Sequence, residues 1–91
     1  MAFHLSGTIT IPASDLERVR AALPEHRRLT LLEPGCRVLT VEEQADGVFA
    51  VNETFVDEAA FAVHQARLRG TVWAAVSANA VRDYRTWQDN A

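Results

Sequence analysis

The chain has 91 residues, of which 48% are hydrophobic, and a formal net charge of -3 at pH 7. This length allows one domain, residues 1–91, with an ordered core that we expect over about 3–87. The acidic balance argues against nucleic-acid binding, which needs a basic face. No apolar run approaches the roughly 20 residues of a membrane span, so we expect neither nucleic acid nor membrane as a partner.

The small size points to a partner subunit. A domain this short buries only roughly 60–65% of its unfolded surface, and a disulfide, a metal or a second subunit is the usual supplement. Cys36 is the one cysteine, and no Cys/His spacing indicates a metal site. The N-terminus lacks the pattern of a secretory signal, and an unpaired cysteine suits a reducing compartment. We therefore expect a cytoplasmic homodimer.

The first elements in the chain are a strand and a helix. Residues 3–11 alternate polar and apolar side chains, which predicts a strand with two unlike faces. Gly7 on its apolar side suggests a bulge or a close backbone approach. Ser14 or Asp15 is expected to cap the helix that follows, with Glu17 placed as in a capping box.

The middle of the chain reads as the end of this helix and a hairpin. Pro24 predicts a kink or a restart of the helix, and Glu33-Pro34-Gly35 predicts its end. Residues 36–44 and 48–56 are expected strands. Ala45-Asp46-Gly47 between them is a hairpin turn signal, because Asp-Gly readily adopts positive φ values.

The last third predicts two helices and a strand. Asp57 is expected to cap a helix that runs to about Arg69, and Gly70 to end it. Thr71 can cap a third helix that continues towards Ala80. Residues 81–87 alternate as a last strand, and the tail from Gln88 to Ala91 is expected to be disordered.

The predicted order is β-α-β-β-α-α-β. This is an α+β, ferredoxin-like pattern with an antiparallel sheet and with its second helix in two pieces. Helices on one side of a four-stranded sheet leave the other side bare. Because that face is partly apolar here, we expect a homodimer formed through the sheet face.

Three segments together resemble the antibiotic biosynthesis monooxygenase family: LLEPGC at 31–36, NETFVDEAAFAVHQ at 52–65 and TVWAAVSANAV at 71–81. The resemblance spans nearly the whole chain in order. It implies a dimeric α+β barrel and oxygenation of a small quinol, phenol or anthrone-like aromatic by O2 without a cofactor. Among the members of this family, the chain is similar to the quinol monooxygenases.

His64 and Glu53 are the candidate catalytic residues. His64 can accept a phenolic proton because the unperturbed pKa of histidine lies near neutrality; alternatively it is a buried histidine bonded to a strand group such as Glu53. Glu53 lies among apolar strand residues and should be paired or have a raised pKa. The candidate substrate-binding residues are Phe55, Phe61, Trp73 and Arg69.

Five further residues have a possible role at the site and a simpler structural one. His4 is expected at the solvent, with a pocket or a dimer contact as alternatives. Cys36 is expected to pack rather than to act as a nucleophile. Arg67 and Arg82 are further candidates to hold an anionic oxygen, and Tyr84 is a further candidate to line the pocket.

The sequence is also compatible with two other classes of function. Val51 and Phe61 are apolar where some tailoring members of the family are polar, which favours a non-catalytic, small-molecule-binding or structural dimer with a filled pocket. A haem-degrading monooxygenase shares the fold. It is disfavoured because the first strand offers Ser6 and Gly7 rather than the asparagine that the haem-degrading enzymes need.

Overall fold

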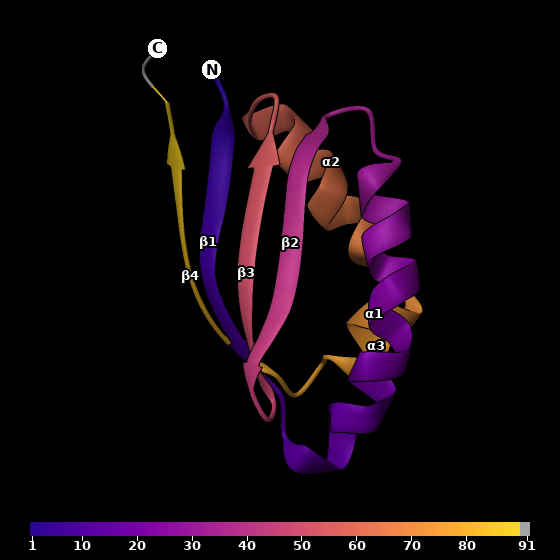
Figure 1. Ribbon diagram of the computed structural model, residues 1–91. Helices are drawn as coiled ribbons and strands as arrows, with labels where there is room; N and C mark the ends of the chain where they lie inside the picture. The colour runs from indigo at the N-terminus through magenta and orange to yellow at the C-terminus, as the bar shows by residue number, and fades with distance from the viewer. Residues whose placement is uncertain (90–91) are drawn as a thin grey trace.

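The computed structural model describes residues 1–89 and places three helices on one side of a four-stranded antiparallel sheet (Figure 1). The strands are β1 (Phe3–Thr10), β2 (Cys36–Ala45), β3 (Val48–Phe55) and β4 (Val81–Gln88); the helices are α1 (Leu16–Leu31), α2 (Glu58–Leu68) and α3 (Val72–Val76). A turn of 3-10 helix, Ala13–Asp15, precedes α1. The predicted α+β, ferredoxin-like class is confirmed.

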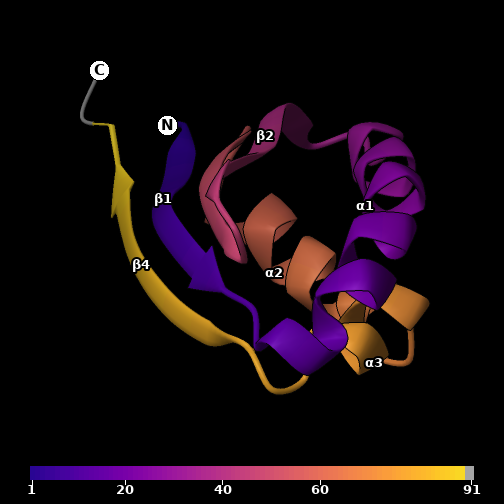
Figure 2. The same cartoon turned by 60° about the horizontal axis from the view of Figure 1, so that its bottom comes forward.

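The strand order in the sheet is β2-β3-β1-β4, so β1 pairs with both β3 and β4. Leu5 lies opposite Glu53 on one side and Thr86 on the other. Figure 2 shows that the sheet curves around α2, with the helices on its inner side. Alternation then decides which side chains reach the helices, because successive residues of a strand point to opposite faces.

The two later helices begin as the sequence predicts. The Asp57 side chain accepts a hydrogen bond from the Ala60 amide at the start of α2, and the Thr71 side chain accepts one from the Ala74 amide at the start of α3. Both caps satisfy an amide that the first turn would otherwise leave without a partner. α3 ends at Val76, four residues before the predicted end.

Three local predictions are wrong. Asp15 is at the N-cap position of α1, but its side chain makes no capping bond; it pairs with Arg18 and accepts a bond from Asn79 instead. The predicted restart of the helix at Pro24 is wrong, because α1 runs through this residue; the kink that was its alternative stays a prediction. The tail is ordered further than expected, because the Asp89 amide bonds to the Ala2 carbonyl. Residues 90–91 lie outside the described residues.

Two glycines have clear geometric reasons. At Gly7 a Cβ would lie 2.0 Å from the Asp83 carbonyl oxygen, so the predicted close approach of two backbones is confirmed. Gly47 has φ +79° in the β2–β3 turn, which is the positive value expected of the Asp-Gly signal. Both glycines allow strands to meet at close range.

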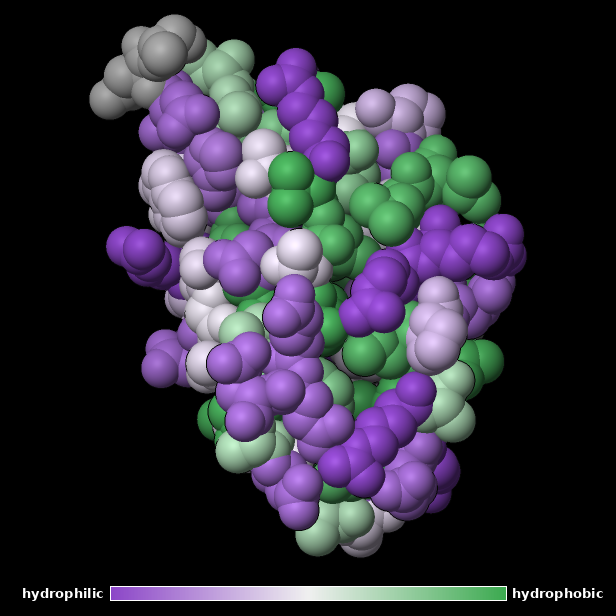
Figure 3. All heavy atoms as spheres, in the orientation of Figure 1, coloured by the Kyte–Doolittle hydropathy of each residue, from purple (hydrophilic) through white to green (hydrophobic). Residues whose placement is uncertain are grey.

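The core lies between the sheet and the helices. Its fully buried members include Ile9, Val19, Phe49 and Phe55, each at 1% exposure or less. On the face drawn in Figure 3, apolar side chains show mainly between the strands and α1, with hydrophilic ones around them. No helix among the described residues is long and apolar enough to cross a membrane.

Candidate active site

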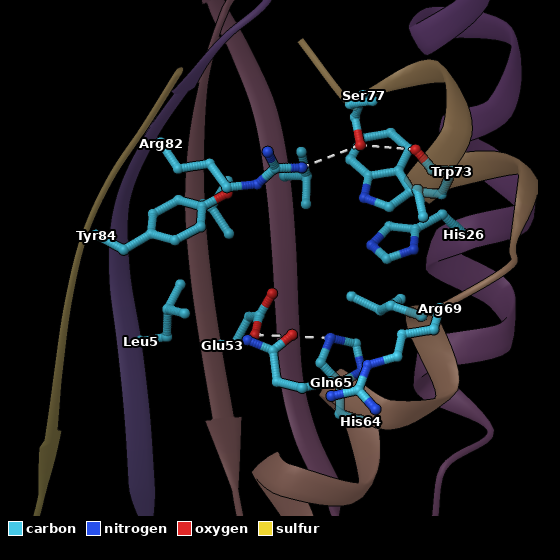
Figure 4. Close-up of a pocket in the computed structure, with 15 residues that line it drawn as sticks. Leu5, His26, Glu53, His64, Gln65, Arg69, Trp73, Ser77, Arg82 and Tyr84 are labelled. Carbon is cyan, nitrogen blue, oxygen red and sulfur yellow. Dashed lines mark hydrogen bonds and ion pairs between the residues drawn. The ribbon is translucent and has the colours of Figure 1, made fainter. Parts of the chain in front are cut away.

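A cavity of about 350 Å³ lies between the inner face of the sheet and the α2–α3 segment (Figure 4). All four strands and all three helices contribute to its lining. The acidic, basic, amide and phenolic side chains among them are His26, Glu53, His64, Gln65, Arg69, Arg82 and Tyr84. Leu5, Val41, Val51 and Leu68 supply apolar surface. A mainly apolar pocket with a few polar anchors is the usual form of a small-molecule site.

One polar network fixes His64 on the wall of this cavity. His64 is 1% exposed, and its Nδ1 donates to Glu33 Oε2 at 2.8 Å. Arg67 Nε donates to the same oxygen at 2.7 Å, and its Nη2 donates to Thr30 Oγ1 at 2.9 Å. A carboxylate can only accept hydrogen bonds, so Nδ1 is the protonated nitrogen of this pair, and a neutral ring in this tautomer presents the lone pair of Nε2.

Gly35 explains how Glu33 reaches His64. Glu33 lies in the turn after α1, and a Cβ at Gly35 would lie 2.4 Å from the Cβ of Ala60. Only glycine allows the turn to approach α2 this closely. Ala60 and His64 are four residues apart on one helix face, so the turn that contacts Ala60 also brings Glu33 to the histidine.

Glu53 faces the other side of the imidazole. Its Oε1 lies 3.9 Å from His64 Nε2, and the residue is 9% exposed. Burial and, to a lesser degree, the nearby Glu33 charge together raise the pKa of the Glu53 carboxyl to about 7. Near neutral pH the Glu53 carboxyl therefore exchanges its proton, which suits a group that handles a substrate proton.

His26 and Trp73 form an aromatic wall of the cavity. Their rings stack with centroids 4.3 Å apart and an interplanar angle of 9°. Burial lowers the pKa of His26 to about 4, with smaller contributions from His64, Arg67 and Arg27. His26 is thus neutral at pH 7 and serves as a flat partner for the indole. The same pair borders a second hollow of about 490 Å³ beside α1.

Four predicted site residues meet at the cavity. Glu53, His64, Trp73 and Arg69 all line it. Their catalytic and binding roles remain predictions, but their common location is now established. The predicted pair of His64 with Glu53 is present, but the two groups are 3.9 Å apart. The closer partner of His64 is Glu33, which the periodicity of the sequence did not indicate.

Phe55 and Phe61 do not line the cavity, contrary to expectation. Phe55 is fully buried, and its ring lies 5.1 Å from that of His64 and 5.5 Å from that of Phe61. Phe61 also packs on Phe3 with ring centroids 4.8 Å apart. Phe55 therefore packs directly against His64, and the half-buried Phe61 packs against Phe55. Helical spacing predicts that Phe61 lies on the inner face of α2, but it does not predict whether the side chain lines the cavity or packs against other side chains.

The other residues considered from the sequence lie partly in the cavity and partly outside it. Tyr84 and Arg82 line the cavity, whereas Arg67 does not and instead pairs with Glu33. His4 lies on the opposite face of the sheet, so a pocket role for it is wrong. Cys36 is partly buried, and burial raises the pKa of its thiol, which fits packing better than nucleophilic attack.

Within residues 1–89, no group of three or more histidine, cysteine, aspartate and glutamate side chains is arranged to hold a metal ion. The site residues that sequence reasoning missed are Glu33 and His26. The acid in LLEPGC was a visible signal for Glu33, since an acidic residue at a helix exit opposes the helix dipole. His26 gave none, because Pro24 obscured the helical spacing around it.

The structure defines the class of protein as an α+β domain with a cavity under a curved sheet. No protein-family model matches the sequence, and a comparison with curated proteins finds no match. Solved structures do match. A candidate antibiotic biosynthesis monooxygenase from Nitrosomonas europaea has a TM-score of 0.80 at 16% identity, with all of both chains covered.

Two further structures agree. SnoaB, a cofactor-independent oxygenase from Streptomyces nogalater, has a TM-score of 0.78 at 12% identity and covers 99% of this chain and 94% of its own. A candidate antibiotic biosynthesis monooxygenase from Deinococcus radiodurans has a TM-score of 0.75 at 23% identity and covers 100% and 94%. The chain therefore has the fold of the antibiotic biosynthesis monooxygenases, as the sequence resemblance implies.

Proposed function

We propose that the protein is a cofactor-independent monooxygenase that oxidises a small quinol, phenol or anthrone-like aromatic with O2. The observation that supports this most is the position of His64 Nε2, which lies in the wall of a mainly apolar cavity with Glu53 3.9 Å away. An oxygenase among the proteins of the same fold supports it further.

His64 is the proposed base, and Glu53 supports it. Glu33 and Arg67 hold the imidazole with its Nδ1 protonated, so Nε2 is free to take the proton from a substrate hydroxyl or carbon acid. Glu53, with its pKa raised to about 7, stabilises the imidazolium once it forms. Proton removal by a positioned base contributes typically ~100-fold to 10,000-fold in rate.

The substrate supplies the electrons. Deprotonation of an anthrone or quinol gives a carbanion-like species that reduces O2 by one electron, and the resulting radical pair combines at carbon. For an anthrone-like CH2, one oxygen atom becomes the new carbonyl, and the other leaves as water with the two hydrogens of that carbon. The reaction balances without a reductant, and the protein has to remove the proton and exclude water.

The non-catalytic alternative predicts a filled space beside His64. The cavity of about 350 Å³ at that position removes the main observation that would favour a structural dimer. A binding protein for small molecules would still have such a cavity. A measurement of substrate turnover distinguishes a monooxygenase from a binding protein, whereas a measurement of binding does not.

We also propose that two copies pair through the outer face of the sheet. The side chains of this face include the exposed apolar residues Val38, Val81 and Trp87, which a second sheet would cover. Light scattering after gel filtration should give twice the mass of one chain, and Trp87→Glu should give the monomer. A monomer in the wild type would contradict this pairing.

The test of the function is oxygen uptake. The purified protein, free of added cofactor, is mixed with a panel of quinols, phenols and anthrones in an oxygen electrode. We expect O2 consumption of one molecule per substrate and one ¹⁸O atom in the product by mass spectrometry. Absence of turnover for the whole panel, with binding retained, would contradict catalysis and favour a binding protein.

A further inference from the structure

The cavity contains two arginines with no acidic partner. Among residues 1–89, four arginines form ion pairs, namely Arg18, Arg20, Arg28 and Arg67, and none of them lines the cavity. Arg69 and Arg82 line it, and in the described part of the chain neither forms an ion pair. The two arginines that face the proposed substrate, Arg69 and Arg82, therefore both lack a carboxylate partner among the described residues.

Arg82 is the better ordered of the two. Its Nη2 donates to Ser77 Oγ at 3.0 Å, and that hydroxyl, fully buried, donates to the Trp73 carbonyl at 2.6 Å. One nitrogen of the guanidinium is therefore anchored to the helix side of the cavity, and the guanidinium also lies beside the Tyr84 hydroxyl. Figure 4 shows it near the Tyr84 side chain, away from Glu53 and His64.

This side of the cavity offers donors. Burial raises the pKa of Tyr84 to about 12, so its hydroxyl stays protonated at neutral pH and can donate. A guanidinium has five N–H groups and accepts no hydrogen bond. Its planar fork matches a carboxylate with two parallel bonds, whereas a neutral ring hydroxyl satisfies only one of them.

We propose that the substrate is a hydroxylated aromatic carboxylic acid, whose carboxylate binds Arg82 while its hydroxyl faces His64 and Glu53. This inference rests on the proposed function for the role of the hydroxyl, but the carboxylate contact is independent of turnover. The cavity volume of about 350 Å³ lies at the low end of ligand pockets, roughly 300–1,000 Å³. The volume favours a single-ring acid.

Arg85 provides a matched control on the same strand. It lies opposite Ser6 in the register, on the outer face, and its guanidinium stacks over Trp87 at 4.8 Å. Arg82 lies opposite Ile9 and faces inward. Replacing either arginine with glutamine removes one positive charge from β4, but only Arg82→Gln removes it from the cavity.

The test compares two probes under anaerobic conditions by isothermal titration calorimetry at pH 7.5. The probes are 2,5-dihydroxybenzoate and hydroquinone, which differ only in the carboxylate. We expect the wild type to bind the acid at least ~10-fold more tightly, as one charge-assisted pair provides. Arg82→Gln should abolish this preference while hydroquinone binding stays within ~2-fold, and Arg82→Lys should keep part of it.

Arg85→Gln should keep the full preference. Equal affinities for the two probes in the wild type, no binding of either probe, or a preference retained in Arg82→Gln would overturn the proposal. Circular dichroism of each variant confirms that it is folded. A preserved preference for the acid without any oxygen uptake would leave the carboxylate site standing and contradict only the monooxygenase function.

Discussion

Two histidines on opposite faces of the sheet have similar partners and very different surroundings. His64 donates to Glu33 at 2.8 Å on the inner face. His4 contacts Asp89 at 2.9 Å and Thr54 at 2.9 Å on the outer face, and its ring stacks on Trp87. A histidine next to a carboxylate is therefore present twice in this small protein.

The difference between them lies in burial and in access to a cavity. The His64 side chain is 1% exposed and that of Glu33 9%, against 19% for His4 and 47% for Asp89. His64 has a second carboxyl, Glu53, on the cavity side, whereas both ring nitrogens of His4 are already bonded. Of these two histidine–carboxylate pairs, only that of His64 is a candidate site, because only this histidine lines a cavity.

The largest expected effect separates the two histidines in catalysis. His64→Ala should lower kcat/KM for oxygen uptake by about 1,000-fold, because the base is lost. His4→Ala, the matched control, should change it by less than about 3-fold, since rate effects of this size reflect small positional shifts. Rates measured in an oxygen electrode check this, and equal losses in both variants would remove the distinction between the faces.

The next effect concerns Glu53, which has no counterpart beside His4. Its pKa is raised from 4.5 to about 7 in the folded state, so the stability linked to it is present below pH 4.5 and is lost as pH rises through 7. Wild type minus Glu53→Gln should therefore lose up to about 3 kcal/mol in free energy of unfolding between pH 4.5 and 8. Urea melts at several pH values measure it, and a flat difference would contradict the raised pKa.

A smaller effect on the rate is expected when Glu33, the hydrogen-bond partner of His64, loses only its charge. Glu33→Gln should lower kcat about 10-fold with KM little changed, as positioning partners of a catalytic imidazole do. In ¹⁵N NMR spectra, His64 should change from one tautomer, protonated at Nδ1, to a mixture. Asp89→Asn should alter the signals of His4 alone. A single unchanged His64 tautomer in Glu33→Gln would show that Glu33 does not position the ring.

The smallest effect is expected on the outer face. Asp89→Ala should lower the free energy of unfolding by less than about 1 kcal/mol, because a half-exposed ion pair is screened by solvent. Glu33→Ala leaves His64 and Arg67 without their shared acceptor and should lower it by about 3 kcal/mol. Chemical denaturation compares the two variants directly. Similar losses would show that burial does not distinguish the two pairs.

The sequence predicted the parts of the fold that depend on local pattern. Alternation placed Glu53 on the inner face of β3, and the capping residues Asp57 and Thr71 located the starts of α2 and α3. These signals work because they involve neighbours along the chain. Pro34 and Gly35 also predicted where α1 ends. The sequence did not predict that the helix continues through Pro24.

The sequence could not predict contacts between distant segments. Glu33 and His64 are 31 residues apart, and their contact depends on the packing of the turn at Gly35 against Ala60. The depth of Phe61 in the core and the stacking of His26 on Trp73 likewise arise from how helices settle on the sheet. The sequence thus predicted four residues of the candidate site, Glu53, His64, Arg69 and Trp73. It predicted neither their hydrogen bonds nor the presence of Glu33 and His26.

The most direct test of the central claim is proton removal without oxygen. A quinol is titrated with protein at pH 7 under anaerobic conditions, and ultraviolet difference spectra record the phenolate. We predict a phenolate band with the wild type and with His4→Gln, and none with His64→Gln. A band of equal size with His64→Gln would contradict the account of this cavity as a proton-abstraction site.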